Sequence, residues 1–349
     1  MTMATMLENA PRIIIRQNGD HFDLESERST MVSGFLKGKP LVFAKTLLTS
    51  LMGLCPVSHR EAFEAACQGS TSNASGQRVA IEAMLESVRV FGVDWQRYAS
   101  RIVISEDSLW QLGQLRQRLF DVLATQNEKD TERLFFDTQR FVRHFQLAYA
   151  DLPDALLKAV EVFSSLSAMT ESVLLKPDQL KQRKTLEWLL NQLEINPLFA
   201  IEPRLSGPRL VGSVARVKPI LMQDEPLTIK LLVLCRWLEL SRWAGMPSDD
   251  LGDFMPAVFD FDDGRKVAVV ETVRGPLVHV VKTDGVLLAD CHVIAPTEWV
   301  FQSNGIVIEQ INEFVTQTTL KGKALHDALS LLVSLFDACT DVQVGETHA

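Results

Sequence analysis

The sequence lacks an excess of positive charge, a long apolar run and a leader pattern, and each absence narrows the possible functions. It carries 35 Lys and Arg against 44 Asp and Glu, a net charge of −9. This argues against nucleic acid as a main partner, because phosphate binding needs a basic surface. No apolar run reaches the roughly 20 residues that span a bilayer, and residues 1–16 do not read as a signal peptide. We therefore expect a cytoplasmic protein that binds neither membranes nor nucleic acid.

Cysteine is also scarce. Five cysteines, an odd number, stand at wide spacing, which does not fit a disulfide framework and favours a reducing compartment. No Cys-x-x-Cys pair is present, because Met52 is the third residue before Cys55 and Val342 is the third after Cys339. Cys67 and Cys235 lie in small-residue and apolar runs, which is typical of cysteines buried as small hydrophobes.

Helical periodicity dominates the rest of the chain. Its 349 residues can bury a large core in one or two domains. Residues 69–76 form a polar stretch that we expect to be a loop. Apolar residues recur at helical spacing in several segments, and we expect helices at 40–66 (with a break at Met52–His59), 109–122, 134–145, 155–168, 179–193, 227–243 and 322–337.

Two segments have the pattern of antiparallel β structure. Residues 11–24 flank an Asn18-Gly19-Asp20 turn and predict a hairpin. Runs rich in β-branched residues at 267–270, 277–281 and 286–288 are separated by turn signals at 274–276 and 284–285. The predicted fold class is therefore mainly α with a small antiparallel β element, that is, α+β.

Two half-motifs suggest metal chemistry. Cys55 is followed four residues later by His59, which gives a soft metal a thiolate ligand and a nearby orienting group. Cys339 follows the last expected helix. By itself a cysteine at a helix break or after a helix is more often a buried core residue, so the neighbouring residues must decide between the two interpretations.

Those neighbours, taken in order, resemble the large subunit of nickel–iron hydrogenases. The family motif Arg-x-Cys-Gly-x-Cys-x-x-x-His is matched in part by Gly53, Cys55 and His59. The motif Glu-x-x-Arg-Gly-x-Leu-x-His is matched by residues 271–279, Pro-Thr/Ser-x-Trp by residues 296–299, and Asp-Pro-Cys-x-x-Cys by Asp337 and Cys339. The resemblance spans nearly the whole chain and implies a trimmed large-subunit fold.

The departures from the family pattern imply that nickel is not bound. Met52 replaces one terminal thiolate and Val342 one bridging thiolate, while Ser50 and Ala338 replace an arginine and a proline. The upstream Arg-Gly-x-Glu, whose glutamate moves protons in the family, falls at Ser29–Val32 and is absent. The closing histidine falls on Gly345, and His348 nearby is not a substitute. We therefore expect neither hydrogen turnover nor another enzymatic activity.

The residues that remain are those that would hold an iron carrying cyanide and carbon monoxide. The resemblance implies Cys55 and Cys339 as iron ligands, Arg274 as a donor to one cyanide, and Pro296 with Thr297 as the contacts of the second. A buried guanidinium suits cyanide because it is a permanent, charged donor. Four residues after Cys55, His59 is placed to donate to the sulfur. Arg274 could instead be a turn arginine that faces solvent. His279 lies on an alternating strand, and we expect it to be a hydrogen-bonded core or edge residue and not a ligand.

This selective loss resembles the HupK/HoxV-type hydrogenase maturation proteins, which are shortened relatives of the large subunit. The resemblance implies a scaffold that holds Fe(CN)2(CO) transiently and serves a hydrogenase large-subunit precursor, with a small assembly chaperone and iron-loading proteins as further partners. It also implies one domain over 1–349, with a helical core at 40–245, the β element at about 258–300 and a C-terminal helix at 322–338. The alternatives are a metal-free interaction protein that mimics the large subunit, and a residual redox enzyme or hydrogen sensor.

Overall fold

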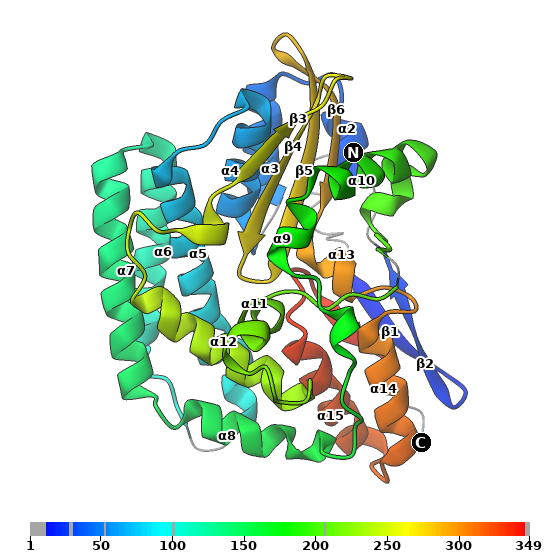
Figure 1. Cartoon of the computed structure of the whole chain (residues 1–349). Coiled ribbons are helices and arrows are strands. Elements are labelled where there is room, and N and C mark those ends of the chain that lie inside the picture. The colour runs from blue at the N-terminus through cyan, green and yellow to red at the C-terminus, as the bar shows by residue number, and fades with distance from the viewer. Residues whose placement is uncertain (1–11, 28–30, 52–53, 100–101, 206, 346–349) are drawn as a thin grey trace.

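A four-stranded antiparallel sheet and a surrounding set of helices form the fold (Figure 1). The computed structural model describes residues 12–27, 31–51, 54–99, 102–205 and 207–345. The sheet has the order β3-β4-β5-β6, with strands Ala257–Asp260, Arg265–Thr272, Gly275–Asp284 and Leu287–Ile294. Helix α4 (Pro56–Gln68) packs on β4 and β5. Both strands are buried along most of their length, which explains their nearly continuous runs of apolar residues.

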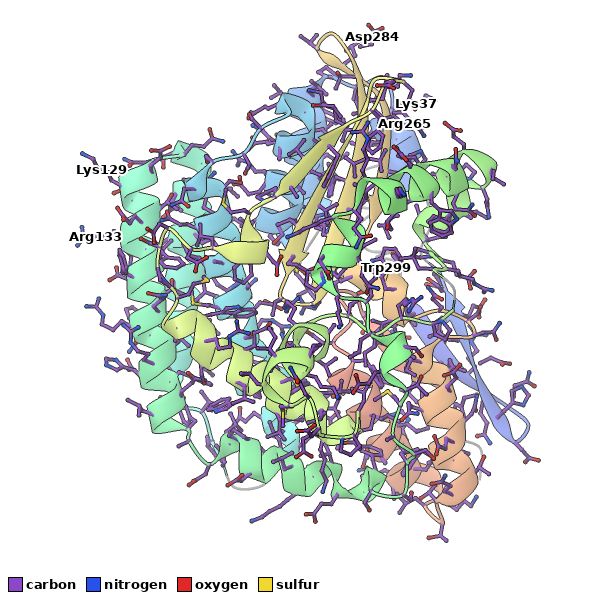
Figure 2. The ribbon with its side chains drawn as sticks, viewed as in Figure 1. Lys37, Lys129, Arg133, Arg265, Asp284 and Trp299 are labelled. Carbon is purple, nitrogen blue, oxygen red and sulfur yellow. The ribbon has the colours of Figure 1, made fainter. Side chains whose placement is uncertain are left out.

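The largest group of helices lies beside this sheet, on the left of Figure 1. Helices α5 (Asn73–Arg89), α6 (Glu106–Thr125) and α7 (Glu128–Ala148) pack against one another, and α12 (Ile229–Ala244) packs on α5, α7 and α11 (Ser213–Leu221). Figure 2 shows Lys129 and Arg133 pointing outward from α7, whereas Trp299 lies inside and is fully buried. The side of the helix that carries Lys129 and Arg133 is thus the outer face of the group.

Shorter elements complete the chain. The remaining α-helices are α2 (Met31–Leu36), α3 (Leu41–Leu51), α8 (Leu152–Ala159), α9 (Pro177–Leu180), α10 (Arg183–Ile195), α13 (Pro296–Val300), α14 (Ile306–Gln317) and α15 (Gly322–Leu335). Single turns of other helical types lie at Val90–Asp94, Gln96–Tyr98, Val160–Phe163, Glu171–Val173, Pro197–Ala200 and Gly252–Phe254. Among the described residues no helix is both long and apolar enough to cross a membrane.

A second sheet joins the two ends of the chain. Strands β1 (Ile13–Asn18) and β2 (His21–Ser26) form the predicted N-terminal hairpin, and β7 (Val342–Val344) pairs with β1 in parallel. The register places Ile13 opposite Val342. The segment that follows α15, which contains Cys339, is therefore held at both ends, by the helix and by this pairing.

The predicted class is confirmed, since helices dominate and the β content is small. The break between α3 and α4 falls at the expected motif, and Pro56 occupies the first position of α4, where a missing N–H costs nothing. The predicted β5–β6 hairpin is present, but its turn is one residue later than predicted, at residues 285–286, because Asp284 still belongs to β5 and pairs with Leu287. Gly285 has a φ of 58°.

Four local predictions were wrong. Residues 69–76 are not all loop, because α5 begins at Asn73 and the Ser72 hydroxyl caps it by accepting the Ser75 amide. The helix expected at 155–168 is α8 (Leu152–Ala159) and a single turn, and the helix expected at 179–193 is split into α9 and α10. The last strand begins at Leu287 instead of Val286 and extends to Ile294.

Candidate functional site

Cys55 stands at the entrance to α4, in a position that the sequence of the break determines. It is the residue before Pro56 and has a non-helical φ of −133°, as expected before proline. The first amides of α4 are satisfied by Glu82 of α5, whose carboxylate accepts from Val57 N (2.8 Å), Ser58 N (2.9 Å) and the Ser58 hydroxyl (2.5 Å). The cysteine side chain is thereby fixed in the core, with 6% of the residue exposed.

Arg274 lies in the turn between β4 and β5 and points inward. The Thr272 hydroxyl accepts the Arg274 amide at 3.1 Å and donates to the Gly275 carbonyl at 3.0 Å, which closes the turn. Gly275 has a φ of 128°, and a Cβ there would lie 2.7 Å from Val211, so this turn requires glycine. The Arg274 side chain is only 1% exposed, which excludes the interpretation as a solvent-facing turn arginine.

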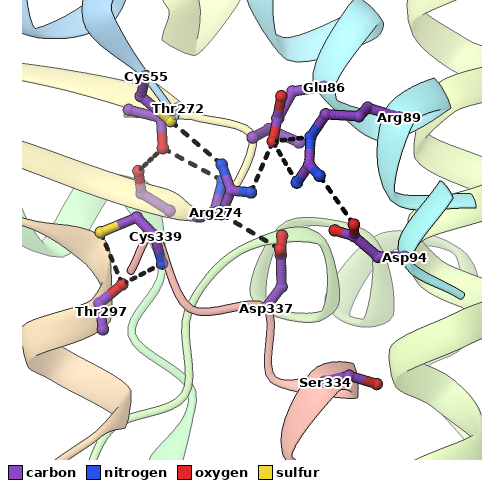
Figure 3. A network of polar contacts seen from close by, with 12 residues as sticks. Cys55, Glu86, Arg89, Asp94, Thr272, Arg274, Thr297, Ser334, Asp337 and Cys339 are labelled. Carbon is purple, nitrogen blue, oxygen red and sulfur yellow. Dashed lines mark hydrogen bonds and ion pairs between the residues drawn. The ribbon is translucent and has the colours of Figure 1, made fainter. Parts of the chain in front are cut away.

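The Arg274 guanidinium reaches three partners at once (Figure 3). One terminal nitrogen lies 3.2 Å from the Cys55 sulfur, the other donates to Glu86 at 2.8 Å, and Nε donates to Asp337 at 3.2 Å. Because guanidinium is planar with donors in fixed directions, these contacts set its orientation. Arg274 therefore links the start of α4, helix α5 and the segment after α15.

Each carboxylate that holds Arg274 has a second cationic partner. Glu86 also accepts from Arg89 at 2.7 Å, and Arg89 pairs with Asp94 at 2.8 Å. Asp337 also pairs with Arg236 of α12. Asp337 adopts a φ of 51°, a left-handed conformation that aspartate tolerates better than most residues.

Cys339 contacts the Thr297 hydroxyl through both its amide and its sulfur. The Thr297 oxygen accepts the Cys339 amide at 2.7 Å and donates to the Cys339 sulfur at 2.8 Å. Thr297 is buried at the second position of α13, directly after Pro296, which begins the helix. In Figure 3, Thr297 and Cys339 lie on one side of the β4–β5 turn and Cys55 on the other. The structure thus brings together Cys55, Arg274, Thr297 and Cys339 from segments more than 280 residues apart.

His59 lies one turn into α4 and faces the sheet. Its Nδ1 atom is 3.1 Å from Nε2 of His279 on β5, and the two rings meet edge to face with centroids 5.2 Å apart. His279 is fully buried, as expected for a core histidine, and burial lowers its pKa to about 3. The predicted bond from His59 to the Cys55 sulfur stays a prediction.

Electrostatics favours the protonated form of the first thiol. Burial raises the pKa of Cys55 well above its ordinary value, against the lowering effect of Arg274, and Glu82, Glu86 and Cys339 raise it further. Burial also opposes the charge of Glu86 and Asp337, but the arginines beside them outweigh it and hold both pKa values below their usual ones. The site therefore keeps charged carboxylates and arginines around a neutral Cys55.

The donor set suits a small thiolate-bound group more than a metal ion with a full protein cage. Among the described residues no group of three or more His, Cys, Asp and Glu could hold a metal ion. Two sulfurs and a buried guanidinium are present instead, and soft thiolates suit iron with π-accepting ligands. Met52, Ser29 and His348 lie outside the described residues, so the predictions made for them have no structural counterpart. Val342 is part of β7.

Sequence reasoning missed the acidic partners of Arg274. Asp337 precedes Cys339 by two residues, where the family motif has its aspartate, and that match was a usable signal. Glu86 lies inside α5, for which no helix was predicted, and nothing near it in the sequence marks it as a partner of an arginine 188 residues away.

Comparisons with known proteins bear on the fold and on part of the sequence. No protein-family model matches the chain. A segment of 102 residues is 32% identical to the hydrogenase expression/formation protein HupK of Bradyrhizobium diazoefficiens. It covers 29% of this chain and 27% of that relative, so the match spans about a quarter of the relative's length.

The structural matches extend over nearly the whole chain. An NAD+-reducing nickel–iron hydrogenase, in the H2-reduced state, aligns with a TM-score of 0.60 at 16% identity and covers 92% of this chain and 93% of its own. The nickel–iron–selenium hydrogenase of Desulfomicrobium baculatum aligns with a TM-score of 0.58 at 12% identity, with 93% and 95% covered. The expected large-subunit-like fold and the expected resemblance to HupK are confirmed. By fold the chain is similar to nickel–iron hydrogenase large subunits, and over part of its sequence it is similar to a HupK-type hydrogenase formation protein.

Proposed function

We propose that this protein is a non-catalytic scaffold in the maturation of a nickel–iron hydrogenase, on which Fe(CN)2(CO) is held between Cys55 and Cys339 before transfer. The observation that carries the proposal is the contact between the buried Arg274 guanidinium and the Cys55 sulfur at 3.2 Å, with Cys339 and its partner Thr297 close by (Figure 3). The segment of HupK-like sequence supports a role in hydrogenase formation. The partners we propose are a hydrogenase large-subunit precursor, a small assembly chaperone and iron-loading proteins.

The side chains offer one contact for each part of this cargo. The sulfurs of Cys55 and Cys339 are soft donors for the iron. The Arg274 nitrogen that lies 3.2 Å from the Cys55 sulfur is a charged donor that a cyanide nitrogen can accept from. The Thr297 hydroxyl is the second donor: its one proton, which it donates to the Cys339 sulfur in this structure, would turn to the cyanide when cargo is bound. Pro296 fixes its position at the start of α13.

A raised thiol pKa suits a carrier that must release its cargo. Iron binding requires the thiolate, so loading removes a proton from Cys55, whose pKa is raised by burial. That proton competes with iron and weakens the hold. Two protein thiolates in place of four weaken it further, which favours transfer to a site with the full ligand set.

Infrared spectroscopy tests the proposal directly. Protein purified without oxygen from cells that express the assembly machinery is expected to show cyanide and carbonyl stretching bands. Cys55→Ala and Cys339→Ala should abolish them, and Thr297→Val should shift or weaken them. Cys67→Ser is the matched control, because Cys67 lies near the far end of α4 and should leave the bands unchanged. Bands absent from the wild type, or persisting in Cys55→Ala, would overturn the proposal.

A metal-free interaction protein is the second candidate, and one observation favours it. Burial favours a neutral Cys55 thiol, and every polar group on Arg274 is paired inside the protein, so the site is stable without cargo. In that case pull-downs of purified assembly proteins should survive Cys55→Ser and Cys339→Ser with no iron present. Nickel content separates the scaffold and the metal-free interaction protein from a residual redox enzyme or hydrogen sensor. Only the enzyme or sensor needs bound nickel.

A further inference from the structure

Behind Arg274 lies a small cavity whose walls present hydrogen-bond donors. Its volume is about 30 Å³, and it is lined by the start of α11 (Gly212, Ser213 and Val214), by Arg236, and by Arg274 and Asp337. A space of this size suits a particle about as large as a water molecule better than a polyatomic group such as sulfate. The cavity is separate from the two cysteines, which do not line it.

Two buried side chains on this cavity have polar atoms without partners. Arg236 is 4% exposed and Ser213 is 8% exposed. One terminal nitrogen of Arg236 pairs with Asp337, but within the described part of the chain its Nε and other terminal nitrogen, and the Ser213 hydroxyl, have no hydrogen-bond partner. Arg236 also lies over the Trp95 ring, 5.7 Å from its centroid, which fixes the guanidinium in place. A buried donor without an acceptor is costly.

The backbone adds further donors at the same place. Ser213 is the first residue of α11, a helix of nine residues. The first amides of a helix have no acceptor within it, and its dipole leaves this end partly positive. Gly212 has a φ of 81°, and a Cβ there would meet the Arg274 carbonyl at 2.9 Å, so the helix end can approach the turn only with glycine.

We propose that this cavity binds a small monovalent anion of halide size. Guanidinium and backbone N–H groups only donate hydrogen bonds, so an ion that only accepts satisfies them better than water, whose own two hydrogens also need acceptors. The lining carries two arginines and one aspartate, with Glu86 as the other charged partner of Arg274. The anion would accept hydrogen bonds from the Arg236 nitrogens that have no partner among the described residues. Arg236 pairs with Asp337, and Asp337 in turn accepts from Arg274. The proposal does not depend on an iron cargo.

Bromide is the probe for this site. Crystals grown in sodium bromide should give an anomalous peak in the cavity, within hydrogen-bond distance of Arg236 and Ser213. Thermal unfolding should also respond, because a ligand bound only by the folded state raises the midpoint, here by about 2 °C at ten times its Kd for a chain of this length. Sodium isethionate at equal ionic strength supplies an anion too large for the cavity.

Variants separate this site from general salt effects. Ser213→Ala should reduce the bromide-dependent shift, while the exposed serine on α12 in Ser241→Ala should leave it at the wild-type value. Arg236→Met would also remove a charged partner of Asp337, so it cannot separate anion binding from the loss of that ion pair. A cavity that contains only ordered water, or an equal bromide shift in wild type and Ser213→Ala, would overturn the proposal.

Discussion

Replacement of Arg274 by methionine should destabilise the fold strongly, because it removes one charge from a buried network. The change keeps the length of the side chain but leaves Glu86 and Asp337 without their shared partner. Removal of one member of a buried ion pair costs roughly 3–5 kcal/mol. Each carboxylate keeps another arginine, Arg89 at 2.7 Å for Glu86 and Arg236 for Asp337. We therefore expect a loss of about 3 kcal/mol, at the low end of that range.

Urea unfolding followed by circular dichroism measures this loss. The midpoint should fall while the dependence on urea stays the same, since the extent of unfolding does not change. Arg274→Lys should lie between wild type and Arg274→Met, because a single ammonium cannot serve three acceptors in fixed directions. In a double-mutant cycle, Arg274→Met and Glu86→Gln should be non-additive by about 1 kcal/mol or more.

Arg183→Met is the matched control, since Arg183 forms a half-exposed pair with Glu187 at 3.2 Å. Such pairs contribute about 0–1 kcal/mol, so its stability should stay close to wild type. If Arg274→Met cost no more than Arg183→Met, the guanidinium would not be buried between these carboxylates. The geometry of the candidate site would then be wrong.

Three further predictions concern pH, backbone and thiol reactivity. Burial raises the pKa of Glu82 to about 7, so the folded state binds this proton more tightly than the unfolded state does. The resulting stabilisation is complete below the unfolded pKa of about 4.5 and is lost as the pH rises to about 7. Burial raises the pKa of Glu271 to about 7 as well, which adds to the same fall in stability. His279 has a pKa lowered to about 3, so its effect has the opposite sign, and it makes stability increase as the pH rises from about 3 to 6.5. Glu82→Gln should therefore reduce the fall in stability between about pH 5 and 7, and an unchanged slope in urea titrations at each pH would contradict this. Gly275→Ala should cost clearly more than Gly285→Ala. Both glycines have a positive φ, at which a side chain costs about 1–3 kcal/mol, but only at Gly275 would the added Cβ also lie 2.7 Å from Val211, since nothing lies within 4 Å of it at Gly285. Similar losses in thermal unfolding would exclude the close approach to Val211. Native Cys55 should react with iodoacetamide at least about tenfold more slowly than in urea, because it is buried and its pKa is raised; equal rates by peptide mass spectrometry would show that it is exposed.

The parts of the site that could be predicted are those with strong local signals. Pro56 marks the start of a helix, so the position of Cys55 at a break followed from one residue. The β-branched runs on either side of Arg274 predicted two strands and a turn between them, which is where Arg274 lies. The helix that ends before Cys339 followed from leucines at helical spacing.

Helix α5 could not be predicted because nearly all of it is buried. From Ala74 to Val88 every residue is buried, including Gln77, Arg78, Glu82 and Glu86. A helix with no exposed face has no polar side and apolar side to give a helical period, and no helix was predicted here. Of these residues, Glu82 accepts the first amides of α4 and Glu86 pairs with Arg274. The complete burial that removes the amphipathic pattern from α5 therefore also places Glu82 and Glu86 at the site.

The pairing of β7 with β1 shows a different limit. A three-residue strand has no periodic pattern of its own, and its partner lies more than 320 residues away. This pairing matters for Cys339, whose sulfur and amide both contact the Thr297 hydroxyl, because it fixes the far end of the segment that carries the cysteine. Cys55 is held by a helix start inside the core, whereas Cys339 depends on Thr297 and on a short segment tied between α15 and β1. Because the two cysteines are positioned by independent parts of the fold, disruption of β1 should displace Cys339 and leave the contact between Arg274 and Cys55 in place.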